Sequence, residues 1–430
     1  MKVLIKTYGC TLNQADSNII RSILEGAGYD VALTSDLEGA SSEDICIINT
    51  CTVKKPTVQK ISYELQRLSM QKKKIIATGC LASADANLVK KFAPDASIVT
   101  IGSMQKIAEA VEYAKRGKSV VFDAYEKLDR LTLFRPGSSV IAKIPIADGC
   151  TGNCSFCETK FARGPLNSFS EDLIIEAIKR SVERGAKEIE LTAQDVGAYG
   201  IDIGTDICEL LSRIAALEGD FKVRIGMLNP EHLGKHIEEF GEIMKDRHFY
   251  KFIHIPVQSG SNRVLKAMKR YYSVEETESY IEYMREAVPG ITIETDIIVG
   301  FPTESEEDFE ETIKFLKAAR PDVTNVSKFG AMPHTEAAKM EQLPSSVVRS
   351  RSIETSRIVR SLQAEANNRF IGSSVDILIT EENERSFNGR MDNYKQVVLR
   401  AKSNEELGKH YRVLIDGASS NVLFGRRIEE

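Results

Sequence analysis

The chain has 430 residues, of which 42% are hydrophobic and 28% are charged, and its formal net charge is −5. These values are typical of a globular protein with about two to four domains, and they give no overall indication of a nucleic-acid partner. No apolar run approaches the roughly 20 residues of a membrane span, residues 1–5 lack the pattern of a signal peptide, and eight cysteines are too few for a disulfide scaffold. We therefore expect a cytoplasmic protein without a membrane partner.

Residues 1–117 alternate short apolar runs with helical patterns, which predicts a small parallel sheet covered by helices. The expected strands are 2–6, 45–49 and 75–77, with weaker ones at 29–33 and 97–101. The expected helices are 16–25, 53–70, 85–92 and 104–115.

Three cysteines, Cys10, Cys51 and Cys80, follow the strongest of these strands; we call them the N-terminal cysteines. Because the carboxyl ends of parallel strands line one crevice, their side chains are expected to converge. They then form a metal site one ligand short of four; three independent turn cysteines are the alternative. Cys46, in an apolar run, and Cys208, in a helical pattern, are expected to be small core residues.

Residues 54–74 form a basic run, with seven lysines or arginines against one acidic residue, Glu64. Such a run is usually a solvated helix face. Beside the predicted crevice it is also suited to attracting phosphates, because cationic side chains neutralise a nucleic-acid backbone. Both interpretations stay open on the sequence alone.

Residues 118–139 have few periodic signals and are predicted to be a linker. Over residues 140–344 the strand–helix alternation resumes at larger spacing. Its six strands predict either an open doubly wound sheet or an incomplete barrel, and in both folds functional sites lie at the strand carboxyl ends. The expected strands are 140–147, 188–193, 222–228, 251–257, 291–299 and 323–329, and the expected helices are 171–184, 205–216, 232–245, 274–286 and 304–319.

The loop after the first of these strands carries Cys150, Cys154 and Cys157 at C-x3-C-x2-C spacing; we call them the loop cysteines. Four thiolates complete a 4Fe–4S cluster, so three leave one iron open to a substrate or cofactor. A zinc knuckle and three unrelated buried cysteines are the alternatives. Zinc sites usually bring a fourth Cys or His at short range, and the next histidine is only His232, so an iron–sulfur cluster is favoured.

Polar residues in or beside the other strands are further site candidates. Gln194, Gln258 and Asp296 are expected either to contact a ligand or to satisfy one another, because an unpaired buried polar group is costly. His254, in mid-strand, is expected to be a satisfied core histidine. Arg163 follows the loop cysteines and is expected to pair with an anionic group of a cofactor; a surface ion pair is the alternative.

Residues 345–370 are predicted to form one helix that packs on the middle domain. Residues 371–430 lose the helical period and show short strands at 375–379, 386–391, 396–399 and 411–415, separated by glycines, which predicts a small closed β-barrel of the OB type. Such barrels commonly bind RNA, although this segment holds nine lysines or arginines against ten acidic residues.

The chain resembles the radical S-adenosylmethionine methylthiotransferases over essentially its full length. The C-terminal barrel is similar to a TRAM domain, and segments 157–160 (CETK) and 190–195 (ELTAQD) are most similar to the archaeal and eukaryotic branch. The other motifs are 7–10 (TYGC), 49–53 (NTCTV), 78–82 (TGCLA), the loop cysteines, 257–261 (VQSGS) and 296–302 (DIIVGFP).

The resemblance implies an α/β protein with a flavodoxin-like domain at 1–117, a partial (βα)6 radical-SAM barrel at 140–344 and a TRAM barrel at 371–430. It implies two 4Fe–4S clusters. The loop cysteines would hold the cluster that binds and cleaves S-adenosylmethionine, and the N-terminal cysteines would hold an auxiliary cluster that carries the sulfur. Phe156 would lie near the adenine, and the other residues expected to bind the cofactor are Arg163, Gln194, Gln258 and Asp296.

The implied reaction adds a methylthio group to carbon 2 of threonylcarbamoyladenosine next to the tRNA anticodon. The implied partners are tRNA and an electron donor such as a ferredoxin or flavodoxin. Isopentenyladenosine in tRNA and an aspartate of a ribosomal protein are alternative substrates, and an iron–sulfur RNA-binding sensor is the non-enzymatic alternative. A cobalamin enzyme is disfavoured, because the sequence contains no Asp-x-His-x-x-Gly motif and the N-terminal cysteines would be idle.

Overall fold

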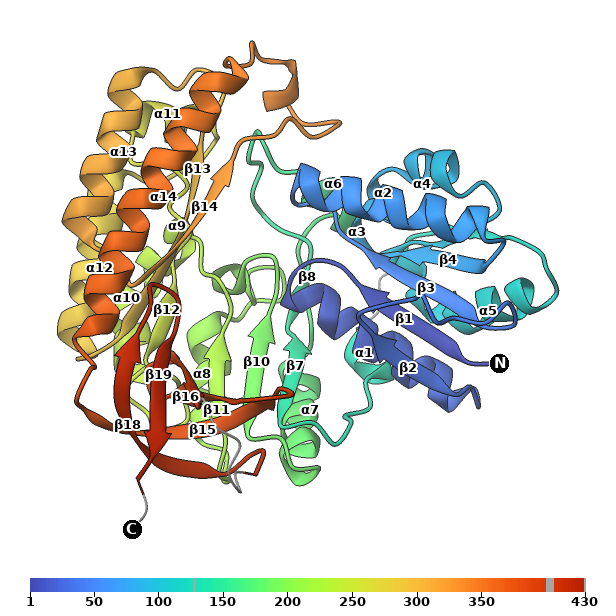
Figure 1. The fold of residues 1–430 in the computed structure, drawn as a ribbon, viewed down its shortest axis with the longest axis horizontal. Helices are drawn as coiled ribbons and strands as arrows, with labels where there is room; N and C mark the ends of the chain where they lie inside the picture. Colours follow the sequence, from blue (N-terminus) through green and yellow to red (C-terminus); the bar gives the residue numbers. More distant parts are fainter. Residues whose placement is uncertain (127–128, 400–405, 429–430) are drawn as a thin grey trace.

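A computed structural model describes residues 1–126, 129–399 and 406–428. The first domain is a six-stranded parallel sheet in the order β2-β1-β3-β4-β5-β6, a doubly wound topology of the flavodoxin type (Figure 1). Its last strand lies inside the segment predicted to be a linker. The strands are β1 (Val3–Thr7), β2 (Val31–Thr34), β3 (Ile45–Thr50), β4 (Lys74–Thr78), β5 (Ser97–Val99) and β6 (Val121–Phe122).

Helices cover both faces of this sheet, which is why every residue of β3 is buried. Ile47 packs with residues of α1 and α5, whereas Ile48 on the opposite face packs with residues of α2, α3 and α4. Cys46 lies on that second face and is fully buried, as expected for a core residue. The helices are α1 (Thr11–Gly26), α2 (Lys55–Met70), α3 (Gly79–Ala84), α4 (Ala86–Phe92) and α5 (Ile107–Lys115), with the 3-10 helix η1 (Ile101–Lys106) before α5.

The middle domain is an incomplete barrel rather than an open doubly wound sheet. Its six strands lie in chain order in two parallel sheets, β7-β10-β11 and β12-β13-β14, and a parallel bridge between Val223 and Phe249 links the two. The strands are β7 (Ile141–Pro145), β10 (Glu188–Thr192), β11 (Lys222–Ile225), β12 (Phe252–His254), β13 (Thr292–Val299) and β14 (Val323–Lys328).

Amphipathic helices return the chain between these strands. The predicted helix 232–245 is divided: α9 (Pro230–Leu233) is followed by the 3-10 helix η4 (Gly234–His236) and then by α10 (Ile237–Ile243). The other helices are α7 (Glu171–Glu183), α8 (Ile207–Ala215), α11 (Asn262–Ala267), α12 (Val274–Ala287) and α13 (Glu306–Ala319). The short elements are α6 (Thr159–Arg163), β8 (Ala147–Asp148), β9 (Asn167–Ser168), η2 (Arg130–Leu133), η3 (Val196–Ala198) and η5 (Ala337–Lys339).

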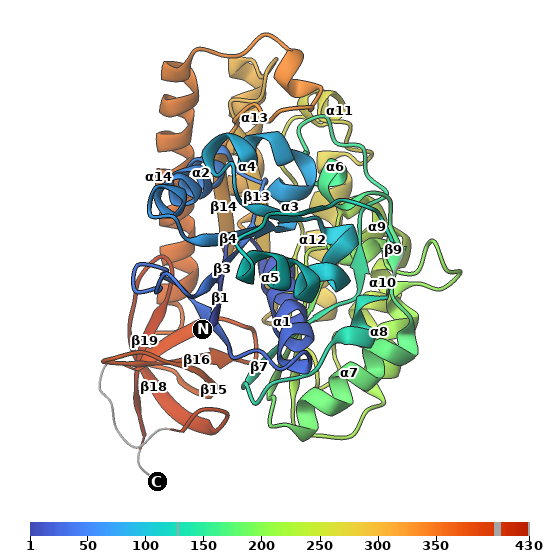
Figure 2. The same ribbon diagram turned by 90° about the vertical axis from the view of Figure 1, so that its right-hand side faces the viewer.

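The long helix α14 (Ser345–Asn368) packs on β14 and leads into the C-terminal barrel (Figures 1 and 2). The barrel closes in the order β15-β16-β17-β19-β18 around apolar residues such as Ile377, Val397 and Ile415. The fifth strand, β19, is not among the strands expected from the sequence. The strands are β15 (Ser374–Glu382), β16 (Phe387–Met391), β17 (Gln396–Leu399), β18 (His410–Ala418) and β19 (Leu423–Arg427).

The first and middle domains meet beside both sets of cysteines. Helix α1 lies against β7, and α3 lies against α6, the short helix that follows the loop cysteines. The carboxyl ends of β1, β3 and β4 therefore face the start of the incomplete barrel. Among the described residues, we find no helix that is both long and apolar enough to cross a membrane.

Candidate active site

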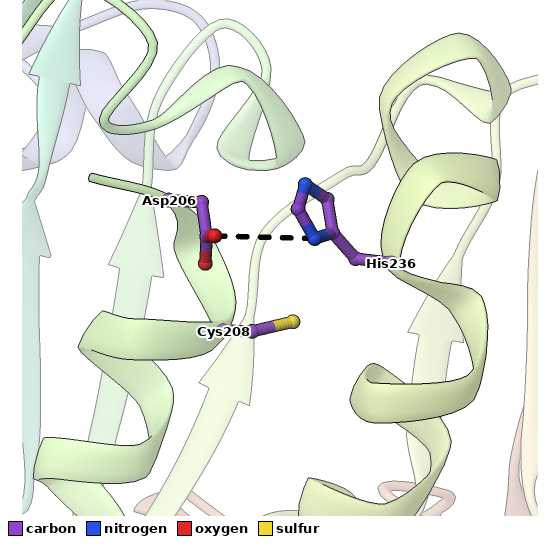
Figure 3. Close-up of side chains that lie close together, drawn as sticks. All are labelled: Asp206, Cys208 and His236. Atoms are coloured by element: carbon purple, nitrogen blue, oxygen red, sulfur yellow. Dashed lines mark ion pairs between the residues drawn. The ribbon is translucent and has the colours of Figure 1, made fainter. Parts of the chain in front are cut away.

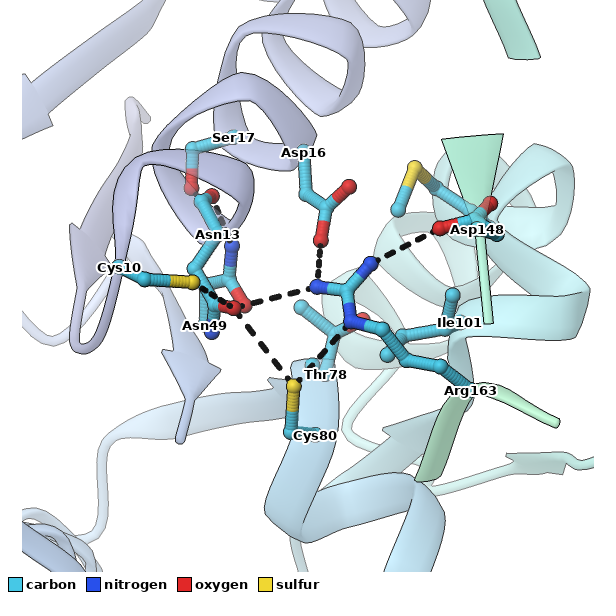
Figure 4. Close-up of polar contacts among 12 residues, drawn as sticks. Cys10, Asn13, Asp16, Ser17, Asn49, Thr78, Cys80, Ile101, Asp148 and Arg163 are labelled. Atoms are coloured by element: carbon cyan, nitrogen blue, oxygen red, sulfur yellow. Dashed lines mark hydrogen bonds and ion pairs between the residues drawn. The ribbon is translucent and has the colours of Figure 1, made fainter. Parts of the chain in front are cut away.

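The N-terminal cysteines converge at one edge of the first sheet, as expected from the strand ends, and Figure 4 shows Cys10 and Cys80 on either side of Asn13. Cys10 precedes α1, Cys51 follows β3, and Cys80 lies in the first turn of α3. The Sγ atoms of Cys10 and Cys80 lie 3.7 and 3.6 Å from one atom, Oδ1 of Asn13. Cys51 lies beside Gly9, because a Cβ added to Gly9 would be 3.0 Å from the Cys51 sulfur.

Asn13 is held in one orientation. Its Nδ2 donates hydrogen bonds to the backbone oxygens of Tyr8 and Thr50, at 3.0 and 2.8 Å. Both partners are pure acceptors, so the amide nitrogen must face them and the amide oxygen must face the cysteines. The buried side chain of Asn13 thus ties α1 to the ends of β1 and β3.

The loop cysteines are positioned by a tight, glycine-dependent loop. Gly149 has a φ of +70°, and a Cβ at this residue would lie 1.8 Å from the carbonyl oxygen of Pro165, so no larger residue fits. The N–H of Gly152 donates to Cys150 Sγ at 3.2 Å. A Cβ on Gly152 would lie 3.3 and 3.8 Å from the sulfurs of Cys150 and Cys154, so the loop curls around these two thiols.

A guanidinium group contacts one sulfur of this loop. Nη1 of Arg270 donates to Cys154 Sγ at 3.3 Å, while its Nη2 donates to the carbonyl oxygen of Pro256 at 3.0 Å. Its Nε donates to Tyr272 Oη at 2.7 Å, which holds the side chain in place. Arg270 is not predictable from the sequence, because it lies 116 positions beyond Cys154 and belongs to no recognisable motif.

A second pair that the sequence analysis missed lies beside the same loop. Asp195 Oδ2 and His232 Nδ1 are 2.7 Å apart, and His232 Nε2 lies 3.4 Å from Oγ1 of the loop residue Thr151. The other carboxylate oxygen of Asp195 accepts from the N–H groups of Gly197 and Asn229. Only the position of Asp195 just after a predicted strand could have indicated this role.

Burial raises the pKa of the Cys51 and Cys150 thiols to about 12, and it also raises those of Cys80 and Cys157. Neighbouring cysteines act in the same direction, because adjacent thiolates would repel one another. All eight cysteines are free of disulfides. A bound metal reverses this protonation, since thiolate is the form that ligates. Each set of three neighbouring cysteines fits a cluster that takes three protein ligands.

The polar candidates of the barrel lie within its strands or shortly after them. Gln194 follows β10, and its buried Oε1 has no hydrogen-bond partner among the described residues. Gln258 has a left-handed φ of 72°, uncommon for a residue with a side chain, and its N–H donates to the backbone of Asp296. Asp296 Oδ2 lies 3.1 Å from His254 Nε2, and Asn325 donates to its Oδ1 at 2.9 Å.

These contacts fix the charge of Asp296. Its burial works to raise the pKa, but the hydrogen bonds from His254 and Asn325 outweigh this effect and lower it. The carboxylate is therefore ionised at neutral pH, and His254 is a satisfied histidine, as expected, through its pairing with a candidate site residue.

Phe156 is half-buried between the second and third loop cysteines. Its ring packs against an apolar cluster that includes Val264, Met268 and Phe301. Phe301 follows β13, so Phe156 joins the cysteine loop to the far side of the barrel.

Arg163 lies buried at the boundary of the first and middle domains, and its guanidinium pairs with protein carboxylates. The side chain is fully buried, which excludes a surface ion pair, and its charge is balanced by two protein carboxylates, Asp16 and Asp148. Its Nε donates to Cys80 Sγ at 3.4 Å, so the guanidinium faces the N-terminal cysteines (Figure 4). This location depends on contacts between two domains, which sequence proximity to the loop cysteines does not show.

A further group of potential metal ligands, Asp206, Cys208 and His236, lies outside this site (Figure 3). Asp206 Oδ1 caps α8 by accepting from the N–H of Glu209. Cys208 is fully buried, and burial raises its pKa to about 12, in agreement with the expected core role. His236 Nδ1 lies 3.9 Å from Asp206 Oδ2. Two of the three side chains thus have structural roles, Asp206 as a helix cap and Cys208 in the domain core.

Comparison with protein families gives two matches. Residues 144–316 match the radical SAM superfamily, and residues 2–101 match a family described as Uncharacterized protein family UPF0004. Among solved structures, the radical S-adenosylmethionine methyltransferase TsrM from Kitasatospora setae, with cobalamin and a 4Fe–4S cluster bound, has a TM-score of 0.58 at 14% identity. The similarity covers 78% of this chain and 77% of that one, and shows that the two share a fold.

Full-length relatives are more similar in sequence. A probable threonylcarbamoyladenosine tRNA methylthiotransferase from Pyrococcus horikoshii is 38% identical over the whole of both chains. The one from Archaeoglobus fulgidus is 37% identical over 100% of this chain and 99% of its own. The human threonylcarbamoyladenosine tRNA methylthiotransferase is 34% identical over all of this chain and 74% of its own. With these identities and the radical SAM match, the chain belongs to the threonylcarbamoyladenosine tRNA methylthiotransferase family of radical SAM enzymes.

Proposed function

We propose that this protein transfers a methylthio group to carbon 2 of threonylcarbamoyladenosine next to the anticodon of tRNA. The observation that carries the proposal is the placement of two separate three-cysteine sets beside one domain boundary, where buried Arg163 contacts Cys80 of one set and Asp148 at the base of the loop that holds the other. One set alone is compatible with many radical reactions. Two sets at one boundary match a reaction that needs both a radical and a sulfur source.

The loop cysteines would hold a 4Fe–4S cluster with one iron open to S-adenosylmethionine, and the N-terminal cysteines would hold a second cluster, so that together these groups supply the radical and the sulfur. The chain's own residues would orient the reactants and exclude water. Phe156 offers an apolar surface, and Gln194 offers a buried acceptor without a protein partner. Gln258, after β12, and the ionised Asp296, within β13, offer further polar groups.

The tRNA would bind where the domains meet. Lys54 and Lys55 are exposed at the start of the basic helix α2, and their charges suit a phosphate backbone. The target base must leave its stack to reach a buried site, as in other enzymes that modify bases. The C-terminal barrel belongs to a class of domain that often binds RNA. A ferredoxin or flavodoxin as electron donor and a cytoplasmic location complete the proposal.

The test is mass spectrometry of tRNA nucleosides from cells with and without the gene for this protein. We expect the methylthio form of threonylcarbamoyladenosine to disappear when the protein is absent. An unchanged amount contradicts the proposed substrate, and the loss of methylthio-isopentenyladenosine or of a modified ribosomal aspartate would identify one of the alternatives.

The N-terminal cysteines can be tested in the purified enzyme by replacing all three with alanine. Reconstituted wild-type protein should contain about eight irons, and the variant should contain about four. The variant should still form 5′-deoxyadenosine but should no longer transfer the methylthio group. Methylthiolation by the variant would overturn the role of these cysteines, and failure of the reduced wild-type protein to cleave S-adenosylmethionine would favour the sensor.

A further inference from the structure

Arg163 uses all three nitrogens of its guanidinium group in buried contacts (Figure 4). Nε donates to Cys80 Sγ at 3.4 Å, and Nη1 donates to Asp148 at 3.0 Å. Nη2 donates to Asn13 at 3.1 Å and also to Asp16. The side chain is 0% exposed, so water does not compete for these contacts.

These partners come from both sides of the domain boundary. Asp16 and Asn13 lie on α1, which begins directly after Cys10, whereas Asp148 ends β8, two residues before Cys150. The guanidinium of Arg163 therefore contacts both a sulfur of the N-terminal cysteines and a carboxylate at the base of the cysteine loop. Since both carboxylates hold the Nη atoms, Nε can point only toward Cys80.

We propose that Arg163 is a positioning residue that donates an N–H···S hydrogen bond to the Cys80 thiolate and thereby raises the reduction potential of the cluster held by the N-terminal cysteines. The inference rests on the proposed function, which places a cluster at this site. It concerns the electronic properties of that cluster, which the proposed function leaves open.

The physical basis is the charge that a cluster gains on reduction. A hydrogen bond and a positive charge at a ligand sulfur stabilise the more negative state, and both act more strongly in a dry interior. The carboxylates do not cancel this effect, because Asp16 and Asp148 are also neutralised by a second arginine, Arg130. The four side chains together carry no net charge, and the guanidinium of Arg163 is the member that faces the sulfur.

Arg130 provides a matched control. It is also buried, and it pairs with Asp16 at 2.6 Å and with Asp148. Its sulfur contact is with Met104 Sδ, at 3.8 Å, and not with a cysteine. Substitution of Arg130 therefore disturbs the same carboxylates and removes the same charge from the domain boundary, but leaves the contact with Cys80 in place.

The experiment uses full-length protein in which Cys150→Ala, Cys154→Ala and Cys157→Ala leave only the N-terminal cysteines. After anaerobic reconstitution with iron and sulfide, the cluster is titrated with a reductant and followed by visible absorption and electron paramagnetic resonance. We expect Arg163→Gln to shift the midpoint potential to more negative values and to change the resonance of the reduced cluster. Arg163→Lys, which keeps the charge but cannot make every contact, should shift it less.

Arg130→Gln in the same background should shift the potential clearly less than Arg163→Gln, because it removes a counter-charge from Asp16 and Asp148 but keeps the N–H group directed at Cys80. Equal shifts from Arg130→Gln and Arg163→Gln, or no shift from either Arg163 variant, would overturn the inference while leaving the proposed function intact. If the parent protein holds no iron at all, the auxiliary site of the proposed function fails, and the inference fails with it. Arg163→Lys keeps the test decisive if Arg163→Gln does not fold.

Discussion

One cysteine of each set has a buried or half-buried arginine against its sulfur: Arg163 at Cys80 and Arg270 at Cys154. The two arginines come from different parts of the sequence. Arg163 lies six residues after Cys157, whereas Arg270 comes from the segment after α11. Side chains that hydrogen-bond to metal ligands orient them and tune the metal, so both arginines belong to the functional unit even though neither is a ligand.

Arg270→Gln should weaken the loop-cysteine site. The substitution removes the N–H group directed at Cys154 Sγ, and loss of such a partner typically costs about 10- to 100-fold in metal affinity or activity. The measurement is iron content and 5′-deoxyadenosine formation in full-length protein whose N-terminal cysteines are alanine. Lys269→Gln is the control, because Lys269 pairs with exposed Glu336 at the surface. Equal losses from both variants would rule out a specific role for Arg270.

At the scale of elements, the junction between β4 and α3 has the strictest geometry around the N-terminal cysteines. Gly79 has a φ of +86°, and a Cβ there would lie 2.2 Å from Asn49 Oδ1 and 2.5 Å from the Thr50 carbonyl oxygen. The turn into α3 is thus packed directly on the end of β3. It fixes the backbone of the next residue, Cys80.

Gly79→Ala should displace α3 and abolish the N-terminal cysteine site. We expect the reconstituted variant to hold about half of the wild-type iron while 5′-deoxyadenosine formation continues. Gly28→Ala is the matched control: Gly28 has a φ of +85°, so alanine suffers the same backbone strain, but nothing lies within 4 Å of its Cβ. Full iron content in Gly79→Ala would show that the turn tolerates a side chain.

The strands and helices themselves are largely predictable, because fully buried parallel strands appear as short continuous apolar runs such as 45–48. Strands β6 and β19 are not predicted, for physical reasons. Strand β6 has only two residues, and β19 carries Gly425 and two arginines, which leave no clear alternation. The choice between an open sheet and a barrel depends on which strands pair, and the hydrophobic pattern does not contain that information.

The site is predictable where one short segment holds it or where its residues end neighbouring strands of one sheet. The loop cysteines stand close together in the sequence, and the N-terminal cysteines follow from the strand-end rule. The contact of Arg163 with Cys80 spans 83 residues, and its pairing with Asp16 spans 147. Such contacts arise from the docking of two domains. A single sequence does not show which residues change together between relatives, so it gives no signal for them.

At the scale of the whole molecule, the C-terminal barrel is docked on the middle domain partly through a buried carboxyl group. Glu188 in β10 accepts from Tyr250 Oη at 2.9 Å, and Tyr394 of the barrel segment lies 3.4 Å away. Burial, with a further contribution from nearby Glu190, raises the pKa of Glu188 from 4.5 to about 7. The folded protein therefore binds this proton more tightly than the unfolded chain does.

Stability should consequently fall as the pH rises from about 4.5 to about 7, because ionisation of Glu188 is opposed only in the folded state. The full effect is on the order of 3 kcal/mol. Glu188→Gln should lose this part of the pH dependence, as measured by urea unfolding at about pH 5 and about pH 8. A parallel pH dependence in both proteins would show that Glu188 titrates alike when folded and unfolded.

The domain boundary also determines where a polyanion would bind. Lys54 acts electrostatically on Asp296 in β13, and Lys55 Cβ lies 3.5 Å from where a Cβ of Gly330 would stand. The start of α2 thus lies beside the candidate cofactor residues of the barrel. Several other cations of the basic run are already in use: Arg67 pairs with Glu64, and Lys74 pairs with Glu43.

Lys54→Ala with Lys55→Ala should weaken tRNA binding and lower the slope of log affinity against log salt by about 2, because each lysine neutralises about one phosphate. The measurement is filter binding or fluorescence anisotropy over a range of salt. Arg116→Ala with Lys118→Ala, at the exposed end of α5, removes the same charge away from the boundary. If both double variants change the slope equally, the charge acts through the whole molecule and not through α2.

The buried carboxylate of Asp16 has a consequence for the stage of synthesis at which the first domain can fold. Asp16 belongs to the first sheet, but both of its cationic partners, Arg130 and Arg163, come after the last strand of that sheet, Val121–Phe122. A nascent chain that has emerged only as far as β6 would have to bury an anion without a counter-charge, which is costly. The first domain therefore gains one counter-charge for Asp16 when Arg130 has been added, and its complete set of ion pairs forms only after the ribosome has added the cysteine loop and Arg163.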